Sequence, residues 1–279
     1  MPITSTKEDR VSITGDKARY LTTVLRCKKG DELTVFDGKA NCLRTNILRA
    51  DRKEVTVEIV EKFVCDTESP IDITLIQGLL KGQKMDMVIQ KATELGVKEI
   101  IPIITDRSQP RETRRVARWM KIAEEASIQS GRNIIPRIHE PMHFNNWLLS
   151  LTPCTAKGFI FYEEGWVKIS EAVEGLKRSS KESVTDSRTN SLPSFPFAER
   201  INPPTPPFDK GGLGGITEKG GEVGFFVIIG SEGGFTKEEV TRAEEKGLIV
   251  TSLGRRILRA ETASISAITL VQFLFGDLG

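Results

Sequence analysis

The stretch VIIGSEGGFTKEEV, residues 227–240, holds a carboxylate inside a glycine-rich turn that follows an apolar strand. The glycines that allow close backbone approach and positive φ angles there are Gly230, Gly233 and Gly234. Thr236 followed by Glu239 fits a capping box, which predicts that a helix begins at Thr236. Bare amides at such a turn suit a phosphate, but Glu232 would repel one. The turn therefore predicts a neutral or cationic ligand held largely by backbone groups; a glycine turn with a solvated glutamate is the alternative.

A second block, SLGRRILRAETASISAI at residues 252–268, again places a glycine loop between a strand and a helix. Its cations are Arg255, Arg256 and Arg259, and the apolar residues between them are Leu253, Ile257 and Leu258. We expect both loops to follow the carboxyl ends of neighbouring parallel strands, where α/β proteins bind ligands in one crevice. A solvated basic turn is the alternative.

One zinc-binding sequence pattern is present, but without the helix that it requires. HEPMH, from His139 to His143, matches the H-E-x-x-H zinc pattern, which works only on a helix. Pro141 between the histidines, and the extended NIIPRI before them, predict a loop instead. The four cysteines form no CxxC pair, so we expect reduced thiols and no metal site.

Arginines gather at intervals that would share one face of a helix expected near residues 113–130. Arg111, Arg114, Arg115 and Arg118 are spaced i, i+3, i+4 and i+7, with Val116, Trp119, Ala123 and Ala126 on the opposite side. Arg107 and Arg132 would extend this stripe, and a second cluster comprises Arg26, Lys28 and Lys29. Such groups bind phosphates of RNA without reading sequence, and a solvated basic face is the alternative.

The order of elements predicts two parts in this 279-residue chain. Residues 1–68 are expected to form a small β domain, with a turn at Asp37-Gly38 and with Val55, Val57 and Ile59 on one strand face. Beyond Pro70, apolar strands alternate with helices, which predicts a mostly parallel sheet covered by helices. The strands are expected at 71–80, 98–105, 157–164, 224–230 and 248–254, and the helices at 83–96, near 113–130 and at 260–275.

Residues 177–222 interrupt that alternation with a segment rich in Ser, Pro and Gly, which predicts a disordered insert. The net charge of +2 does not by itself indicate a polyanion partner. The N-terminal stretch has no apolar h-region and no run approaches membrane-spanning length, so a soluble, cytoplasmic protein is expected.

Several motifs, taken together, resemble one known family. GSEGGFTKEEV and LGRRILRAETA are similar to the signature of the RsmE-type 16S ribosomal RNA uridine-N3 methyltransferases of the SPOUT superfamily. The likeness extends to YLTTVLRCKKGDELTVFDG at residues 20–38, KGQKMDMVIQKATELGV at 81–97 and EEASIQSGRNIIPRI at 124–138. Tyr20 stands where the family usually has His, and Ser231 where it usually has Pro.

The resemblance implies a PUA-like β-barrel at residues 1–68 and, at 70–279, an α/β SPOUT domain with a C-terminal trefoil knot. It also implies a homodimer that binds S-adenosylmethionine, whose cationic sulfonium and lack of phosphate suit a glycine loop that contains an acid. On this basis one cofactor wall would be formed by Gly230, Glu232, Gly233 and Gly234, the other by Leu253, Gly254, Ile257 and Leu258, and a third loop by Phe161 and Glu163.

The implied reaction makes a chemical demand, because the N3 imide of uracil is largely protonated at neutral pH. Methylation needs a base, or cations that stabilise negative charge on O2 and O4. Arg259 is the first choice for the electrostatic role, Glu232 and Glu261 are candidate bases, and deprotonation through water is a third route. A SPOUT enzyme for another RNA position, or a non-catalytic RNA-binding ribosome assembly factor, are the alternative functions.

Overall fold

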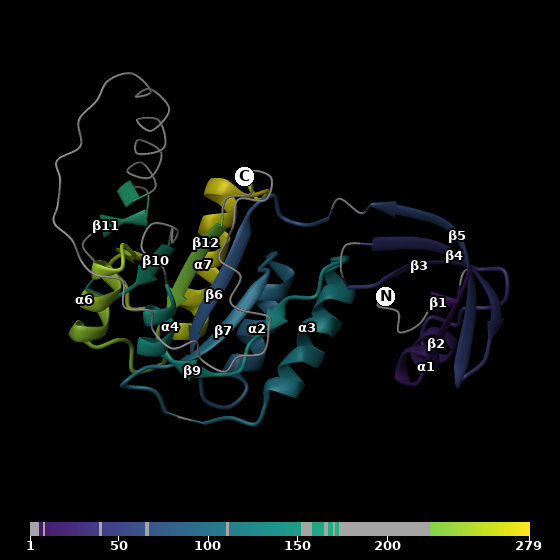
Figure 1. The fold of residues 1–279 in the computed structure, drawn as a ribbon, viewed down its shortest axis with the longest axis horizontal. Coiled ribbons are helices and arrows are strands. Elements are labelled where there is room, and N and C mark those ends of the chain that lie inside the picture. Colours follow the sequence, from purple (N-terminus) through teal and green to yellow (C-terminus); the bar gives the residue numbers. More distant parts are fainter. Residues whose placement is uncertain are drawn as a thin grey trace, which may run out of the picture.

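Two β-sheets organise the chain in the computed structural model (Figure 1). The structure describes residues 6–7, 9–38, 41–64, 67–109, 112–151, 158–164, 167–169, 171–172 and 224–279. The whole of the predicted insert, residues 177–222, therefore lies outside the described residues, as does Arg111. The trefoil knot also stays a prediction, because the chain that would complete it includes residues 173–223, which lie outside them too.

The first sheet is antiparallel and has the strand order β1-β2-β5-β4-β3. Its elements are β1 (Thr6–Lys7), β2 (Arg10–Thr14), α1 (Asp16–Thr23), β3 (Glu32–Phe36), β4 (Asn41–Ala50) and β5 (Glu54–Val64). The alternation predicted for β5 is confirmed: Val55 and Val57 are fully buried, and Ile59 packs against the same core. The predicted turn is confirmed as well, since Gly38 takes φ +78° between β3 and β4.

The second sheet has eight strands in the order β11-β13-β10-β12-β6-β7-β8, with β9 also paired to β7, and every one of its pairings is parallel. The predicted parallel sheet is thus confirmed. Its strands are β6 (Asp72–Gly78), β7 (Glu99–Ile104), β8 (Arg137–Ile138), β9 (Met142–His143), β10 (Gly158–Phe161), β11 (Val167–Lys168), β12 (Gly224–Ile229) and β13 (Ile249–Ser252).

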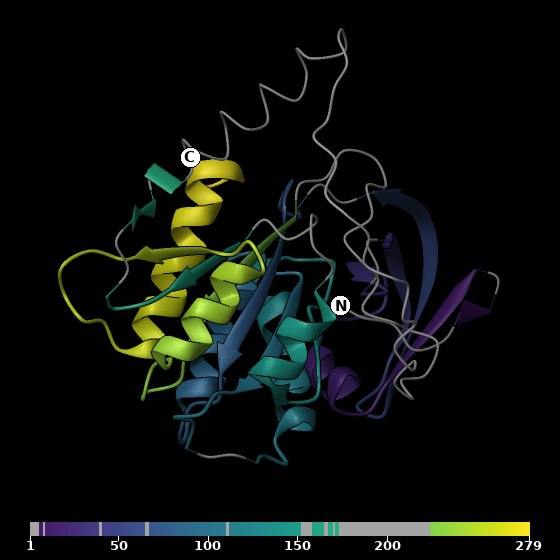
Figure 2. The ribbon, with the colours of Figure 1, turned by 60° about the vertical axis from the view of Figure 1, so that its left-hand side comes forward.

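Helices cover both faces of this sheet (Figure 2). Neighbouring strand residues point to opposite faces, so Val227 joins one core and Ile228 the other. The first face is covered by α2 (Lys84–Glu94), α3 (Val116–Ser130) and α7 (Ala260–Phe275), and the second by α4 (Phe144–Ser150) and α6 (Lys237–Glu245). Burial on both faces explains why these strands are almost continuously apolar.

The helix expected near residues 113–130 begins later than predicted. Arg115 is its N-cap residue and Val116 its first helical residue, so Arg114 and Arg115 precede the helix. The prediction of four arginines on one helix face is therefore wrong, and of that set only Arg118 lies within α3. No Ser, Thr, Asp or Asn side chain caps this end, which is why the sequence offered no clear start signal. The predicted stop is confirmed, because Gly131 takes the left-handed conformation with φ +76°.

One cysteine differs from its expectation. Cys42, at the start of β4, is disulfide-bonded, so reduced thiols were the wrong prediction for it. Spacing along the sequence does not show this, because β4 folds back on β5 and brings distant residues together. Cys27 remains a free thiol.

α3 lies between the two sheets (Figure 1). Lys17 of α1 pairs with Glu124 of α3 at 2.5 Å, so the first part of the chain docks on the outer side of this helix. None of the described helices is long and apolar enough to cross a membrane.

Candidate active site

Three loops leave the same edge of the parallel sheet. In register, Phe161 of β10 lies between Ile229 of β12 and Thr251 of β13, so the loops that begin at 230, 162 and 253 emerge side by side. The prediction that β12 and β13 are direct neighbours is wrong, because β10 separates them. Two strand spacings place β12 and β13 about 10 Å apart, with the loop after β10 between their loops.

The glycine loop after β12 is a closed turn. The Gly234 amide donates to the Ser231 carbonyl at 2.9 Å, and Gly234 takes φ +70°. A Cβ on Gly230 would lie 3.1 Å from the Gly234 backbone, and one on Gly233 would lie 2.8 Å from the Arg107 carbonyl oxygen. These two glycines therefore serve the packing of the loop, whereas at Gly234 the space for a side chain is open.

The end of β6 supports this loop from below. A Cβ on Gly78 would overlap the backbone nitrogen of Ser231, so only glycine allows the contact. Gln77, which is fully buried, donates to the Gly230 carbonyl at 3.4 Å and accepts a hydrogen bond from Ser264 of α7. The sequence analysis missed both residues, although a glycine at the end of the apolar strand LIQG signals a close backbone approach.

Ser231, which replaces the family's usual proline, is buried, and its hydroxyl lies 3.4 Å from that of Thr105. The loop after β7 thus holds the glycine loop on its other side. The predicted capping box is confirmed: the Glu239 amide donates to Thr236 Oγ1, and the Thr236 amide donates to Glu239 Oε2. Glu239 also accepts from the Asp106 amide at 2.9 Å, which ties α6 to the same neighbouring loop.

Glu232 points to the start of α2. Its Oε1 accepts hydrogen bonds from the Lys81 amide at 3.0 Å and from the Lys84 ammonium at 3.1 Å. Partial burial raises the pKa of Glu232, but these two hydrogen bonds, one from its own backbone amide and the charge of Lys84 together leave the pKa below its ordinary value. The charged Glu232 side chain thus joins the glycine loop to the β6–α2 loop by hydrogen bonds. Neither Lys81 nor Lys84 was singled out from the sequence.

The loop after β13 presents apolar surface and a free cation. Leu253 packs against the core, whereas Ile257 is 83% exposed, and Gly254 takes φ +104° with open space where a side chain would stand. Arg259 is the N-cap residue of α7 and is exposed. Its guanidinium makes no hydrogen bond or ion pair with any residue that the structure describes.

Glu261, in the first turn of α7, has a shielded carboxylate oxygen. Oε2 is buried and has no hydrogen-bond partner among the described residues. Leaving such an acceptor unsatisfied typically costs about 1–3 kcal/mol, and more when the group is charged. Glu261 Oε2 is therefore free to accept a hydrogen bond from a group outside the described residues.

The two residues predicted for the third loop differ in burial. The Phe161 side chain is 7% exposed and belongs to the core beneath the loops, with its ring centroid 6.4 Å from that of Phe159. Glu163 is exposed in the loop that follows β10.

Comparison with known proteins gives the relationship of the whole chain. The model of a family described as RNA methyltransferase domain matches residues 67–186 and 208–272, and that of the RNA methyltransferase PUA domain matches residues 13–60. The chain is 30% identical over 270 residues to the ribosomal RNA small subunit methyltransferase E of Buchnera aphidicola, which covers 95% of this chain and 88% of the relative. The chain belongs to this RNA methyltransferase family.

Two further relatives agree. The protein of the same name from Bacillus subtilis is 28% identical over 267 residues, covering 94% of this chain and 89% of that one. The crystal structure of ribosomal RNA small subunit methyltransferase E from Neisseria gonorrhoeae, bound to S-adenosyl methionine, matches with a TM-score of 0.73 at 28% identity, covering 100% of this chain and 98% of that chain. The fold is thus a PUA-like domain joined to an RNA methyltransferase domain of the SPOUT type.

The cations expected to contact RNA differ in what they already bind. Arg114 is exposed and has no described partner, whereas Arg115 donates to the Gly82 carbonyl at 2.6 Å and Arg118 pairs with Asp86 at 3.0 Å. Arg107 is exposed beside the glycine loop and donates to the Gly233 carbonyl at 3.4 Å. The second cluster, whose side chains are all exposed, comprises Arg26, Lys28 and Lys29.

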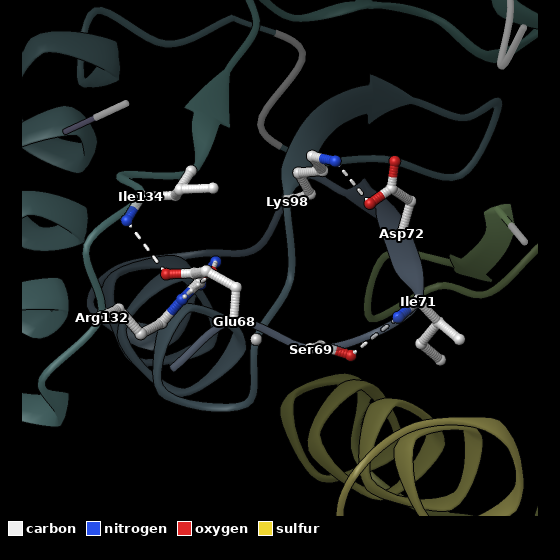
Figure 3. A pocket seen from close by; sticks show the side chains of 8 residues that line it. Glu68, Ser69, Ile71, Asp72, Lys98, Arg132 and Ile134 are labelled. Atoms are coloured by element: carbon white, nitrogen blue, oxygen red, sulfur yellow. Dashed lines mark hydrogen bonds and ion pairs between the residues drawn. The ribbon is translucent and has the colours of Figure 1, made fainter. Parts of the chain in front are cut away.

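Arg132 does not belong to an RNA-binding surface, and its assignment there is wrong. Its side chain is 4% exposed and donates to Glu68 Oε2 at 2.6 Å (Figure 3). It also donates to the carbonyls of Thr93 and Val97. Glu68 Oε1 in turn accepts from the amides of Asn133 and Ile134. These contacts line a small pocket of about 80 Å³ at the amino ends of the strands, opposite the three loops. Arg132 is a structural residue because its partner, 64 positions away in sequence, neutralises it.

The HEPMH segment is not helical, as predicted. His139 follows β8 and His143 ends β9, and His139 Nε2 lies 2.9 Å from Glu99 Oε2. Within the described ranges there is no group of three or more His, Cys, Asp or Glu residues that could hold a metal ion.

Proposed function

We propose that this chain transfers the methyl group of S-adenosylmethionine to N3 of a uridine in small-subunit ribosomal RNA. The observation that carries the proposal is the set of loops at one sheet edge, with open glycine faces and apolar cover on one side and an unengaged arginine on the other. The named relatives support the RNA substrate, and the crystal structure from Neisseria gonorrhoeae supports the cofactor.

The residues present fit S-adenosylmethionine. Open faces at Gly234 and Gly254 let adenine and ribose approach the backbone, and Ile257 and Leu258 supply apolar cover. The unsatisfied Oε2 of Glu261 marks a place for a donor from a bound molecule. The cofactor, when bound, supplies an electrophilic methyl group on a sulfonium. We propose the same two groups of cofactor-binding residues that the sequence predicted, after β12 and after β13. Gly230 and Gly233 shape the first loop, and Phe161 supports the site from the core.

The chain's own residues then have to orient the uracil, accept its N3 proton and stabilise the negative charge that results. The Arg259 guanidinium is proposed to stabilise negative charge that develops on the uracil oxygens when N3 loses its proton. Glu232 and Glu261 are the two carboxylates near the cofactor loops that can accept a proton. A crevice that excludes water strengthens both effects, because charges interact more strongly in a medium of low dielectric constant.

RNA would reach the site along α3. Arg107 contacts the glycine loop, Arg115 contacts the β6–α2 loop, and Arg114 precedes Arg115 at the start of α3. Further along α3, Glu124 pairs with Lys17 of the small domain. The cluster Arg26, Lys28 and Lys29 follows α1 in that domain, beside the 45% exposed Tyr20. Phosphate contacts by such cations make affinity fall as salt rises. Arg114→Ala should make the salt dependence shallower by about one unit, and an unchanged slope would remove Arg114 from the interface.

We also propose a homodimer located in the cytoplasm, with a PUA-like domain at residues 1–68 and the methyltransferase domain at 70–279, interrupted at 177–222. The outer side of α7 supports the dimer, because Phe273 is 58% exposed on a helix that is apolar on most sides. Analytical ultracentrifugation would test this, and a monomer at micromolar concentration would contradict it.

The direct test is transfer of labelled methyl from S-adenosylmethionine to small-subunit particles and to RNA stripped of protein, followed by identification of the methylated atom. Label in 3-methyluridine supports the proposal, and label at another position favours a related RNA methyltransferase. Binding of RNA without any transfer would favour a non-catalytic assembly factor.

A further inference from the structure

Two carboxylates lie near the loops proposed to bind the cofactor, and they differ in the hydrogen bonds that they already accept. Glu232 is engaged by the Lys81 amide and the Lys84 ammonium, both through Oε1. Those donors stabilise the ionised form, which makes the carboxylate a weaker base. Glu261 accepts no hydrogen bond from the described residues, and its Oε2 is shielded from solvent.

The position of Glu261 places it at the same sheet edge as the glycine loop. It lies three residues before Ser264 and therefore on the same side of α7. Ser264 donates to Gln77, which donates in turn to the Gly230 carbonyl, so this side of α7 faces the ends of β6 and β12. Arg259 is two residues earlier, at the helix N-cap, with its guanidinium unengaged.

We propose that Glu261, rather than Glu232, accepts the hydrogen bond from the target imide N3–H and removes its proton. This inference rests on the proposed function. The imide edge of uracil presents a donor between two acceptor oxygens, so it requires an acceptor for N3–H and a donor or cation beside it. Glu261 and Arg259 together supply that pair at one helix terminus.

The step balances as a proton transfer coupled to a displacement. The N3–H proton moves to Glu261 Oε2, and the N3 electron pair forms the new bond to the methyl carbon. The electrons of the breaking carbon–sulfur bond stay on sulfur, which leaves as a neutral thioether. Glu261 then releases the proton to solvent, so one proton is produced for each methyl transferred.

The experiment compares Glu261→Gln with the parental chain on two RNAs, one with uridine and one with 5-fluorouridine at the target position. Fluorine acidifies the imide, so that base ionises with less help. Single-turnover transfer at saturating RNA and S-adenosylmethionine gives the rate, and calorimetry with S-adenosylhomocysteine gives an affinity that does not depend on turnover. Glu245→Gln, an exposed glutamate of α6, is the matched control, and Glu261→Asp keeps a carboxylate if the glutamine variant folds poorly.

We expect Glu261→Gln to slow transfer to the uridine RNA by about a hundredfold or more, with a much smaller loss on the 5-fluorouridine RNA. Affinity for S-adenosylhomocysteine should stay near the parental value, and Glu261→Asp should retain part of the activity. Equal losses on both RNAs would overturn the inference and indicate a structural role. A loss confined to S-adenosylhomocysteine affinity would also overturn it, because the carboxylate would then hold the cofactor's ammonium. If the parental chain does not methylate N3 at all, the proposed function itself fails.

Discussion

Arg259 ends the second loop with an exposed guanidinium that no described residue engages, which suits a group that acts on substrate. Replacing it with Ala should slow single-turnover transfer at saturating RNA by roughly a hundred- to a thousandfold, the loss typical of one donor to a developing oxyanion. RNA affinity should change much less, because one of several cations is removed. Arg242→Ala, on the exposed side of α6, serves as control. Normal turnover by Arg259→Ala at saturation would contradict the assignment.

Arg132 has the opposite character, since it is buried and pairs with Glu68. Arg132→Ala removes the cation from the partly buried Glu68, which keeps only the Asn133 and Ile134 amides as donors, and should lower the free energy of unfolding by up to about 3–5 kcal/mol. Arg118→Ala breaks an ion pair whose arginine side chain is 62% exposed, and should cost at most about 1 kcal/mol. Urea denaturation of the two variants measures the difference. Equal shifts in the two midpoints would show that the Glu68 pair does not stabilise the fold.

At the scale of elements, the junction between β7 and the segment after β8 should make stability depend on pH. The hydrogen bond from His139 lowers the pKa of Glu99 below its ordinary value. The unfolded chain then binds this proton more readily, so the contribution is present above the unfolded glutamate pKa of about 4.3 and is lost as pH falls through the lower folded value. Glu99→Gln should flatten that part of the stability profile measured by denaturation between neutral and acid pH. An unchanged acid slope would show that the pair contributes nothing.

Local patterns predicted most elements, and tertiary contacts account for the rest. Three features that depend only on residues close together in the sequence were confirmed. They are the capping box at Thr236, the helix end at Gly131 and the burial of Val55 and Val57 on one face of β5. The place of β10 between β12 and β13 depends on how the sheet assembles, which strand order along the chain does not encode.

The same limit applies to the site. The glycine loop and Arg259 were visible as a motif, whereas the burial of Arg132 depends on a glutamate 64 residues away. Gln77 likewise links α7 to the glycine loop only because it accepts a hydrogen bond from Ser264, 187 residues later in the sequence. A motif shows the residue types that meet a ligand, but not the distant partners that position them.

For the whole molecule, the family model passes over residues 187–207, between its two matched segments. Their composition, rich in Ser and Pro, cannot supply a packed core. Deleting residues 187–207 should leave both S-adenosylmethionine affinity and the transfer rate close to parental values, as measured by calorimetry and single-turnover assay. Collapse of folding or activity in the deletion variant would show that the segment is a working part of the enzyme.

The central claim, methylation of a uridine N3 in small-subunit ribosomal RNA, is tested most directly in cells. Ribosomal RNA from a strain that lacks the gene is digested and compared by mass spectrometry with RNA from the same strain carrying either the parental gene or the Arg259→Ala variant. The account predicts that one 3-methyluridine disappears on deletion, returns with the parental gene and is strongly reduced with the variant. An unchanged content of 3-methyluridine in the deletion strain would contradict it.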